Sequence, residues 1–340
     1  MAINDVMRGG DCGAKNILIG FTPYHLIPLT HLVKRVQGAV FVFHPMAHKI
    51  AWEIADGVGG FLGGCDQPGR QKYIKYIAAA KELRSLFSKG DRFSLFAPHP
   101  YNPISNFTFF SSAVSERYIF QDGILNYYDA QNPFSSLRKK VNRLASAWSL
   151  GLPYTFYDGH LSGVQAGTID GGYFSHPDRV VLASCFKSVF QMVSDDKNAE
   201  SEWQKKAKNI LFLDQPIENV LKGEVVRAVR EKARKVLLRL GGAVIYKPHH
   251  DQPRNDDAVD GFIQLSGDDA VLPAEFLVEK YKIKCVVSFF SSALVNISLM
   301  YPGVRCIAIA AKDVGVKVDG VDTTLAEVMN KLGVEIYDFD

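Results

Sequence analysis

The feature that most constrains the fold is the alternation of short apolar segments with longer amphipathic ones along the chain. Several of the short segments are apolar throughout, as expected for strands that helices cover on both faces. The longer segments repeat apolar residues every three or four positions, which is typical of helices. This alternation predicts an α/β fold built from parallel βαβ units. The predicted strands are residues 16–21, 39–44, 93–98, 117–121, 180–184, 209–214, 243–247, 285–290 and 305–310.

The length of the chain predicts two domains. At 340 residues it is longer than one typical hydrophobic core supports. A polar, charged stretch at 194–209 interrupts the alternation, and a second βαβ series starts after it. We therefore expect a disordered N-terminus (1–15) and domains at 16–200 and 205–340. Both are predicted to be Rossmann-type and doubly wound, facing each other across a cleft.

The composition excludes several classes of protein. A hydrophobic content of 47% with 22% charged residues indicates a globular chain, and the formal net charge of +3 gives no reason to expect nucleic acid as a partner. Five scattered cysteines without a CxxC pair favour a reducing compartment. The N-terminus does not resemble a secretory signal, and no window of about 18 apolar residues is present. We expect a cytoplasmic protein.

Polar residues follow several predicted strands at the end where doubly wound sheets bind ligands. Each also has an ordinary structural explanation, such as a helix cap at Thr22, a turn at Asp122-Gly123 or a loop start after Asp214. If the carboxylate of Asp122 points into the cleft, partial desolvation would raise its pKa towards the range of a general base. The candidates at strand ends are Thr22, His25, Asp122, Gln215, Lys247 and His249.

Two further candidates lie at predicted helix starts. Ser291 and Ser292 follow the strand at 285–290 and precede an apolar helical segment. Hydroxyls and N–H groups at such a helix start can bind a phosphate, although a plain serine cap explains them equally well. Glu275 opens the helix before that strand, where it is either a first-turn acid favoured by the helix dipole or an acceptor for ribose hydroxyls.

Motifs for cofactors and metals are missing. The sequence has neither a GxGxxG after a strand nor a GxxxxGK[ST], and neither HExxH nor zinc-ligand spacing. His249 and His250 are adjacent at a strand end and are expected to point apart, so one metal ion would not bind both. The only Asp-x-Asp, at Asp338 and Asp340, lies in the final residues. We expect no metal and no cofactor.

Taken together, these motifs resemble those of the bacterial sialyltransferases. Strand–Lys-x-His, Pro-x-Glu at a helix start and strand–Ser-Ser occur in this order between residues 247 and 292, and an acid-Gly pair ends an earlier strand. The order is similar to the D/E-D/E-G, HP and serine motifs of lipooligosaccharide sialyltransferases and capsule polysialyltransferases. The resemblance covers islands between about 16 and 310. It implies a GT-B fold, with an acceptor-side N-terminal domain and a nucleotide-sugar-binding C-terminal domain.

The resemblance also implies roles for individual residues. Asp122 corresponds to the second acid of the D/E-D/E-G motif and His249 to the histidine of the HP motif. Ser291 and Ser292 correspond to the serines that hold the donor phosphate, and Glu275 to the carboxylate at the ribose. The implied reaction is inverting, metal-independent transfer of sialic acid from CMP-sialic acid to a sugar hydroxyl. In this reaction Asp122 is the expected base, His249 assists departure of CMP, and Lys247, Thr22 and Gln215 contact the donor.

The sequence departs from the family motifs at two positions. Gln121 replaces the first acid, and because an amide cannot accept the acceptor's proton, the role of base moves to Asp122 or, alternatively, to Asp214. His250 stands where the HP motif has proline. Pro248, which precedes His249, is expected to stiffen the same turn.

Four further features are candidates for contacts with the acceptor side. Residues 137–148 form a basic, partly amphipathic segment, which is either a solvated helix face or a contact with the anionic inner face of a membrane. His25, His44 and Arg254 are candidates for contacts with the acceptor or with a sugar carboxylate.

Three other functions fit parts of the same pattern. A transferase that uses another nucleotide sugar, such as CMP-Kdo, would share the motifs at the strand ends. A sugar-nucleotide epimerase or hydrolase of GT-B type would keep the histidine and serine sites but need no acceptor. A binding module without catalytic activity would explain a cleft, but Asp122 and His249 would then have no role in a reaction.

Overall fold

The computed structural model describes residues 15–22, 24–33, 35–36, 38–42, 61–62, 70–132, 134, 136–192, 202–221, 223–249 and 261–337. The chain divides into two compact units. Unit 1 comprises Met1–Asp122, Ala130–Pro177 and Leu182–Met192, and unit 2 comprises Gly123–Asp129, Asp178–Val181 and Val193–Asp340. The predicted disordered segment at 1–15 lies outside the described residues except for Lys15, which begins the first strand.

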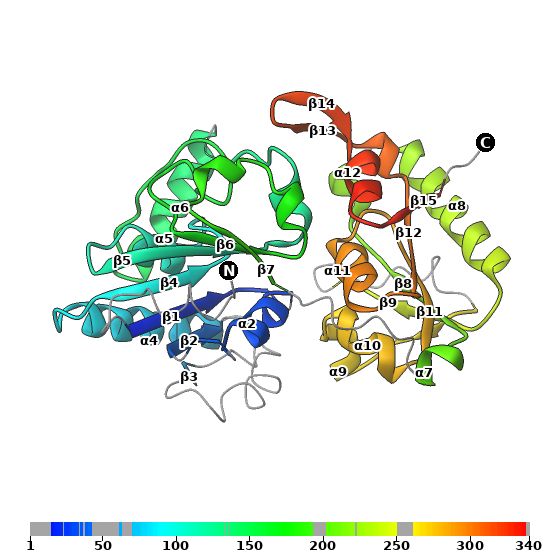
Figure 1. Cartoon of the computed structure of the whole chain (residues 1–340), viewed down its shortest axis with the longest axis horizontal. Helices are drawn as coiled ribbons and strands as arrows, with labels where there is room; N and C mark the ends of the chain where they lie inside the picture. The colour runs from blue at the N-terminus through cyan, green and yellow to red at the C-terminus, as the bar shows by residue number, and fades with distance from the viewer. Residues whose placement is uncertain are drawn as a thin grey trace. The chain divides into compact units, whose positions relative to one another are not determined.

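Unit 1 contains one parallel sheet of seven strands in the order β3-β2-β1-β4-β5-β6-β7 (Figure 1). Its strands are β1 (Lys15–Gly20), β2 (Gly38–Val42), β3 (Phe61–Leu62), β4 (Phe93–Ala97), β5 (Val114–Phe120), β6 (Gly171–Phe174) and β7 (Val189–Gln191). Its helices are α2 (Leu26–Val33), α4 (Arg70–Phe87), α5 (Pro103–Phe109) and α6 (Leu137–Ser149). The chain reverses its direction across the sheet between β1 and β4, so α2 and α5 cover opposite faces. This explains why β4 is buried at every position.

Unit 2 repeats this topology with six parallel strands in the order β10-β9-β8-β11-β12-β15. The strands are β8 (Asn209–Leu213), β9 (Val244–Lys247), β10 (Ile263–Gln264), β11 (Ile283–Ser288), β12 (Arg305–Ile309) and β15 (Glu335–Tyr337). The helices are α7 (Glu202–Lys205), α8 (Glu224–Leu240), α9 (Asp268–Val271), α10 (Ala274–Lys280), α11 (Ser292–Met300) and α12 (Leu325–Lys331). Helix α8 covers one face of the sheet, and α10 and α11 cover the other (Figure 1). An antiparallel hairpin of β13 (Gly315–Val318) and β14 (Val321–Thr324) precedes α12.

Both units are therefore doubly wound α/β domains, as the alternation of strands and helices predicted. The fold differs from the prediction in two short segments of the N-terminal half that pack in unit 2. The first contains the 3-10 helix η1 (Gly123–Tyr127), and the second follows Pro177. The backbone N–H of Val181 donates to the carbonyl of Asn126 and joins the two segments, at 3.1 Å.

The strand predicted at residues 180–184 is wrong. Residues 180–182 form a turn that leads into a 3-10 helix at Ala183–Cys185, and Leu182 has a left-handed φ of 55°. Val180 and Val181 are buried, so the apolar run belongs to a buried connecting segment that is not a strand. The actual neighbour of β5 is β6, whose first two residues are glycines. Glycine has a low strand propensity, which hid this strand in the sequence.

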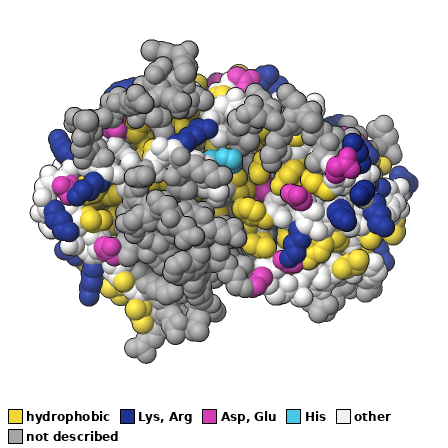
Figure 2. Space-filling model, turned by 60° about the horizontal axis from the view of Figure 1, so that its bottom comes forward, with side chains coloured by type: hydrophobic (Ala, Val, Ile, Leu, Met, Phe, Trp, Pro, Cys, Tyr) yellow, Lys and Arg dark blue, Asp and Glu magenta, His cyan; other side chains and the backbone are white. Residues whose placement is uncertain are grey.

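Positive and negative side chains are interspersed over the described surface shown in Figure 2. This agrees with the mild net charge. Among the described helices, none has the length and apolar character needed to cross a membrane.

Candidate functional site

Three strand ends of unit 1 bring together one carboxylate and two histidines. Asp122 follows β5, His25 follows β1 and His99 follows β4, and these strands are neighbours in the sheet. The Oδ1 atom of Asp122 lies 2.9 Å from Nε2 of His25, and its Oδ2 atom lies 3.5 Å from Nε2 of His99. We call these three residues the Asp122 cluster. His99 was not predicted, although it follows a predicted strand just as His25 does.

Backbone hydrogen bonds determine which ring nitrogens of the two histidines carry hydrogen. The Nδ1 atom of His25 accepts from the N–H of Phe21 at 2.9 Å and of Thr22 at 3.3 Å. The Nδ1 atom of His99 accepts from the N–H of Tyr101 at 3.1 Å. Because Nδ1 is an acceptor in both rings, the hydrogen of each neutral ring is on Nε2 and points towards Asp122. The two histidines therefore act as donors to the ionised carboxylate.

The ionisation of Asp122 differs from the sequence-based expectation. Burial raises the pKa of its carboxyl, as expected, but the hydrogen bond from His25 and the electrostatic interactions with both histidines lower the pKa below its ordinary value. Asp122 is thus anionic throughout the neutral range. The side chain keeps 19% of its surface exposed, so a substrate hydroxyl can reach it.

His99 makes the stability of the protein depend on pH. Burial lowers the pKa of its ring from 6.5 to about 4, although Asp122 opposes the shift. Between these two pH values the unfolded chain binds a proton at this residue and the folded chain does not, so stability is lost as the pH falls from 6.5 to 4. We expect wild type to lose about 3 kcal/mol more over this range than a His99→Phe variant, measured by denaturant unfolding. Equal losses in both proteins would contradict the burial of a neutral His99.

Two residues beside the Asp122 cluster have different roles. Gln121, at the position of the missing acid, is fully buried, and its Oε1 accepts from the N–H of Ser175 at 2.7 Å. It joins the ends of β5 and β6 and is not exposed to substrate. Thr22 does not cap α2, which begins only at Leu26. Its hydroxyl oxygen is buried and has no hydrogen-bond partner among the described residues.

In unit 2, a lysine and a glutamate lie on the face of the sheet opposite α8. Tyr246 packs in the core beneath α8, so the side chain of Lys247, the next residue in β9, points to the other face. Its Nζ donates to the carbonyl of Ala270 at 2.6 Å, and burial lowers its pKa to about 8, opposed by the charge of Glu275. Glu275 is buried and accepts from Nδ2 of Asn296 at 2.7 Å, and burial raises its pKa.

The serine pair begins α11, as predicted. Ser291 is the N-cap, and its hydroxyl oxygen accepts from the N–H of Ala293 at 3.3 Å. The Oγ atom of Ser292 accepts from the N–H of Ile124 at 2.9 Å, which joins α11 to η1. With its oxygen so engaged, the hydroxyl hydrogen of Ser292 can donate to an anion. Asp122 is the last residue of its segment of unit 1, and Gly123, the next residue, begins the segment of unit 2 that contains Ile124.

The glycine of the acid-Gly pair is required for this contact. Gly123 has a φ of +60°, and a Cβ atom there would overlap the Oγ of Ser292. We expect Gly123→Ala to lower the free energy of unfolding by about 3 kcal/mol, from left-handed strain and overpacking together. Gly90→Ala is the matched control, because Gly90 also has a positive φ, of +78°, and open space around it. Equal losses in the two variants, measured by chemical denaturation, would show that the contact with Ser292 does not matter.

The residues after β8 support the structure of unit 2. The Oε1 atom of Gln215 accepts from the N–H of Phe290 at 2.8 Å and from the hydroxyl of Ser288 at 3.1 Å, and so fixes the turn before α11. Asp214, the alternative base, is buried and paired with Arg230 at 2.9 Å, and it also accepts from the hydroxyl of Tyr246. These partners occupy both carboxylate oxygens of Asp214.

His249 follows β9 and is half-buried. His250, the candidate Arg254 and the candidate His44 lie outside the described residues. The roles predicted for Arg254 and His44 stay predictions.

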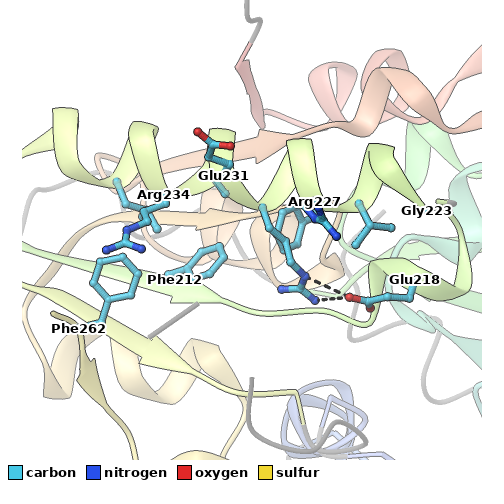
Figure 3. A pocket seen from close by; sticks show the side chains of 12 residues that line it. Phe212, Glu218, Gly223, Arg227, Glu231, Arg234 and Phe262 are labelled. Atoms are coloured by element: carbon cyan, nitrogen blue, oxygen red, sulfur yellow. Dashed lines mark hydrogen bonds and ion pairs between the residues drawn. The ribbon is translucent and has the colours of Figure 1, made fainter. Parts of the chain in front are cut away.

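A separate cavity of about 440 Å³ lies beside α8 and contains none of the predicted site residues (Figure 3). Its lining includes Phe212, Phe262, Arg234 and Arg230, and Nη2 of Arg230 donates to Oε1 of Glu218 at 2.8 Å. It lies on the face of the sheet opposite the side chain of Lys247.

Comparisons with known proteins agree with the predicted family. A family model described as alpha-2,8-polysialyltransferase matches residues 104–308, which include Asp122, His249 and the serine pair. The alpha/beta-galactoside alpha-2,3-sialyltransferase of Photobacterium phosphoreum is 12% identical in sequence, with a TM-score of 0.51. The match covers 96% of this chain and 99% of that one. A UDP-GlcNAc 2-epimerase from Neisseria meningitidis, solved with UDP-GlcNAc, is 10% identical with a TM-score of 0.50, covering 93% and 85%.

At these identities the two structural matches show the fold alone, which is the GT-B fold of glycosyltransferases and related epimerases. The resemblance to bacterial sialyltransferases is confirmed by the family model. Among curated proteins, no match was found.

Proposed function

Because this chain belongs to the alpha-2,8-polysialyltransferase family, we propose that it transfers sialic acid from CMP-sialic acid to a terminal sugar of a bacterial surface glycan. The glycan is a lipooligosaccharide, an O-antigen or a capsule, and the transfer inverts the anomeric carbon without a metal ion. The family favours sialic acid as the acceptor sugar and an α2,8 linkage. The observation that carries the proposal is the Asp122 carboxylate, held ionised by two histidines at the carboxyl ends of the strands of unit 1.

Asp122 is the proposed base. The acceptor oxygen forms a bond to the anomeric carbon of sialic acid while the bond from that carbon to the CMP phosphate breaks, and CMP leaves with the electron pair. The acceptor's proton passes to Asp122. A carboxylate of low pKa accepts the proton late, after the new bond has made the hydroxyl acidic. We assign His25 and His99 as positioning residues, because each directs Nε2–H at the base.

The departing phosphate is the proposed ligand of unit 2. His249 would donate to the phosphate oxygen that leaves, a role that an imidazole can fill as a general acid. The ammonium group of Lys247, whose pKa burial lowers to about 8, is still largely charged at neutral pH and would be stabilised by an anion. The hydroxyls of Ser291 and Ser292 add donors where negative charge develops.

Metal-independent chemistry is supported by the way the histidines are used. In the Asp122 cluster each Nδ1 lone pair accepts a backbone N–H and each Nε2–H faces the carboxylate. Neither ring in this state offers a lone pair to a metal ion. Addition of a chelator is therefore expected to leave the activity unchanged.

The donor is tested by ligand stabilisation. We expect CMP to raise the melting temperature of the protein more than UDP, GDP or ADP at equal concentration. A ligand at 100 times its Kd that binds only the folded state adds about 2.7 kcal/mol to stability, which is a readily measured shift. Stabilisation by UDP without stabilisation by CMP would refute the proposed donor and favour an epimerase-like function.

A further inference from the structure

Helix α6 is unusual in its charge. Its sequence, LRKKVNRLASAWS, has four cationic residues and no acidic one, and Ala147 is its only buried residue. The helix belongs to unit 1 (Figure 1). A helix that builds a domain core normally has a wide apolar stripe on its inner face. In α6, Ala147 is the single apolar residue that is buried.

The inner face of α6 is formed by cations that lie on aromatic rings. Lys140, Arg143 and Ala147 are three and four positions apart and so share one face. The guanidinium carbon of Arg143 is 3.9 Å from the ring centroid of Tyr101, and Nζ of Lys140 is 5.7 Å from that of Phe156. These cation–π contacts attach α6 to unit 1 without using its apolar residues.

The apolar residues of α6 are exposed instead. They are separated by four, three and four positions and therefore form one stripe along the helix. Trp148 is the most exposed of them, at 82%, although large aromatic side chains are usually buried. We call these four residues the α6 stripe: Leu137 (76% exposed), Val141 (52%), Leu144 (37%) and Trp148 (82%).

The charges beside the stripe indicate what covers it. With 100° between successive residues, Arg138 lies on one side of the stripe and Lys140 on the other. Cations beside an apolar stripe that contains tryptophan match an anionic bilayer surface, where the apolar groups enter the acyl boundary and the cations meet the headgroups. Each cation near such a surface adds to the attraction.

We propose that α6 binds the surface of an anionic lipid bilayer through the α6 stripe, with the exposed Arg138 at the headgroups. The inference names a partner for the proposed function, since a lipid-linked glycan acceptor would be met at the inner face of the membrane. The contact itself depends on neither the donor nor the acceptor.

The test is binding of the full chain to vesicles, measured by co-sedimentation. We expect binding to vesicles of phosphatidylcholine with phosphatidylglycerol and much weaker binding to phosphatidylcholine alone. A Leu144→Ser/Trp148→Ser variant should bind the anionic vesicles at least about tenfold more weakly, because the stripe supplies the apolar contact. Leu238→Ser is the matched control, since Leu238 is 66% exposed on α8, another basic helix, and its loss should leave binding unchanged.

Activity on a soluble oligosaccharide separates this inference from the proposed function. The stripe variant should keep wild-type transfer to a soluble acceptor, because the side chains of Leu144 and Trp148 are exposed and the cation–π contact of Arg143 that attaches the helix to Tyr101 is kept. Vesicle binding that is unchanged in the stripe variant would overturn the proposal, as would equal binding of wild type to both kinds of vesicle. Loss of a dimer in the stripe variant, with vesicle binding retained, would show that a second copy of the chain covers the stripe.

Discussion

An Asp122→Asn enzyme is expected to fold and to transfer sialic acid with kcat lowered by about 10² to 10⁴, the usual contribution of a general base. Asparagine keeps the shape of the side chain and still accepts from Nε2 of His25. It cannot take the proton of the acceptor hydroxyl, because an amide oxygen is only weakly basic. The measurement is kcat with CMP-sialic acid and a saturating oligosaccharide acceptor, with the melting temperature as a check on folding.

Asp170→Asn is the matched control for this variant. Asp170 is also a carboxylate of unit 1, and it accepts a hydrogen bond from the N–H of Arg117 and pairs with Lys187. It precedes β6, whereas Asp122 follows β5, so the two carboxylates lie towards opposite ends of the parallel strands. Its loss should leave kcat within about twofold of wild type. If Asp122→Asn had kcat near wild type, the base would be another residue. Asp214 would be an unexpected substitute, because Arg230 and Tyr246 occupy its oxygens.

A His249→Asn enzyme is expected to lose a similar factor of about 10² to 10⁴ in kcat, because CMP would leave without a proton donor. The KM for CMP-sialic acid should change little, since the interaction develops mainly in the transition state. His250→Asn is the matched control, because the neighbouring histidine stands at the position of the family's proline and has no proposed role. A large fall in kcat in the His250 variant, with His249→Asn close to wild type, would show that the two assignments are reversed.

Eight of the nine predicted strands are present in the structure, because they depend on local patterns. The run at 93–98 is apolar except for Ser94 and became β4, which is buried at every position. The serine pair became the N-cap and first residue of α11. Both follow from rules that act within a few residues. The run at 180–184 is equally apolar, but it forms a connecting segment that pairs with no strand. A rule that acts within a few residues does not distinguish such a segment from a strand.

The contacts that define the candidate site could not be predicted because their partners are distant in the sequence. His25 and Asp122 are separated by 97 residues, and Ile124 and Ser292 by 168. Burial alone predicted a raised pKa for Asp122, and the direction was wrong because two histidines from other strands lower it. His99 reaches Asp122 only because β4 lies between β1 and β5 in the sheet, an order that the sequence does not state.

Transfer itself is the most direct test of the central claim, which is that this GT-B enzyme moves sialic acid from CMP-sialic acid to a sugar hydroxyl through Asp122 and His249. A sialylated oligosaccharide incubated with the enzyme and CMP-sialic acid should gain sialic acid by mass spectrometry, with one CMP released for each residue added. The Asp122→Asn and His249→Asn enzymes should give almost none. An unchanged acceptor, with another nucleotide sugar consumed in its place, would contradict the claim.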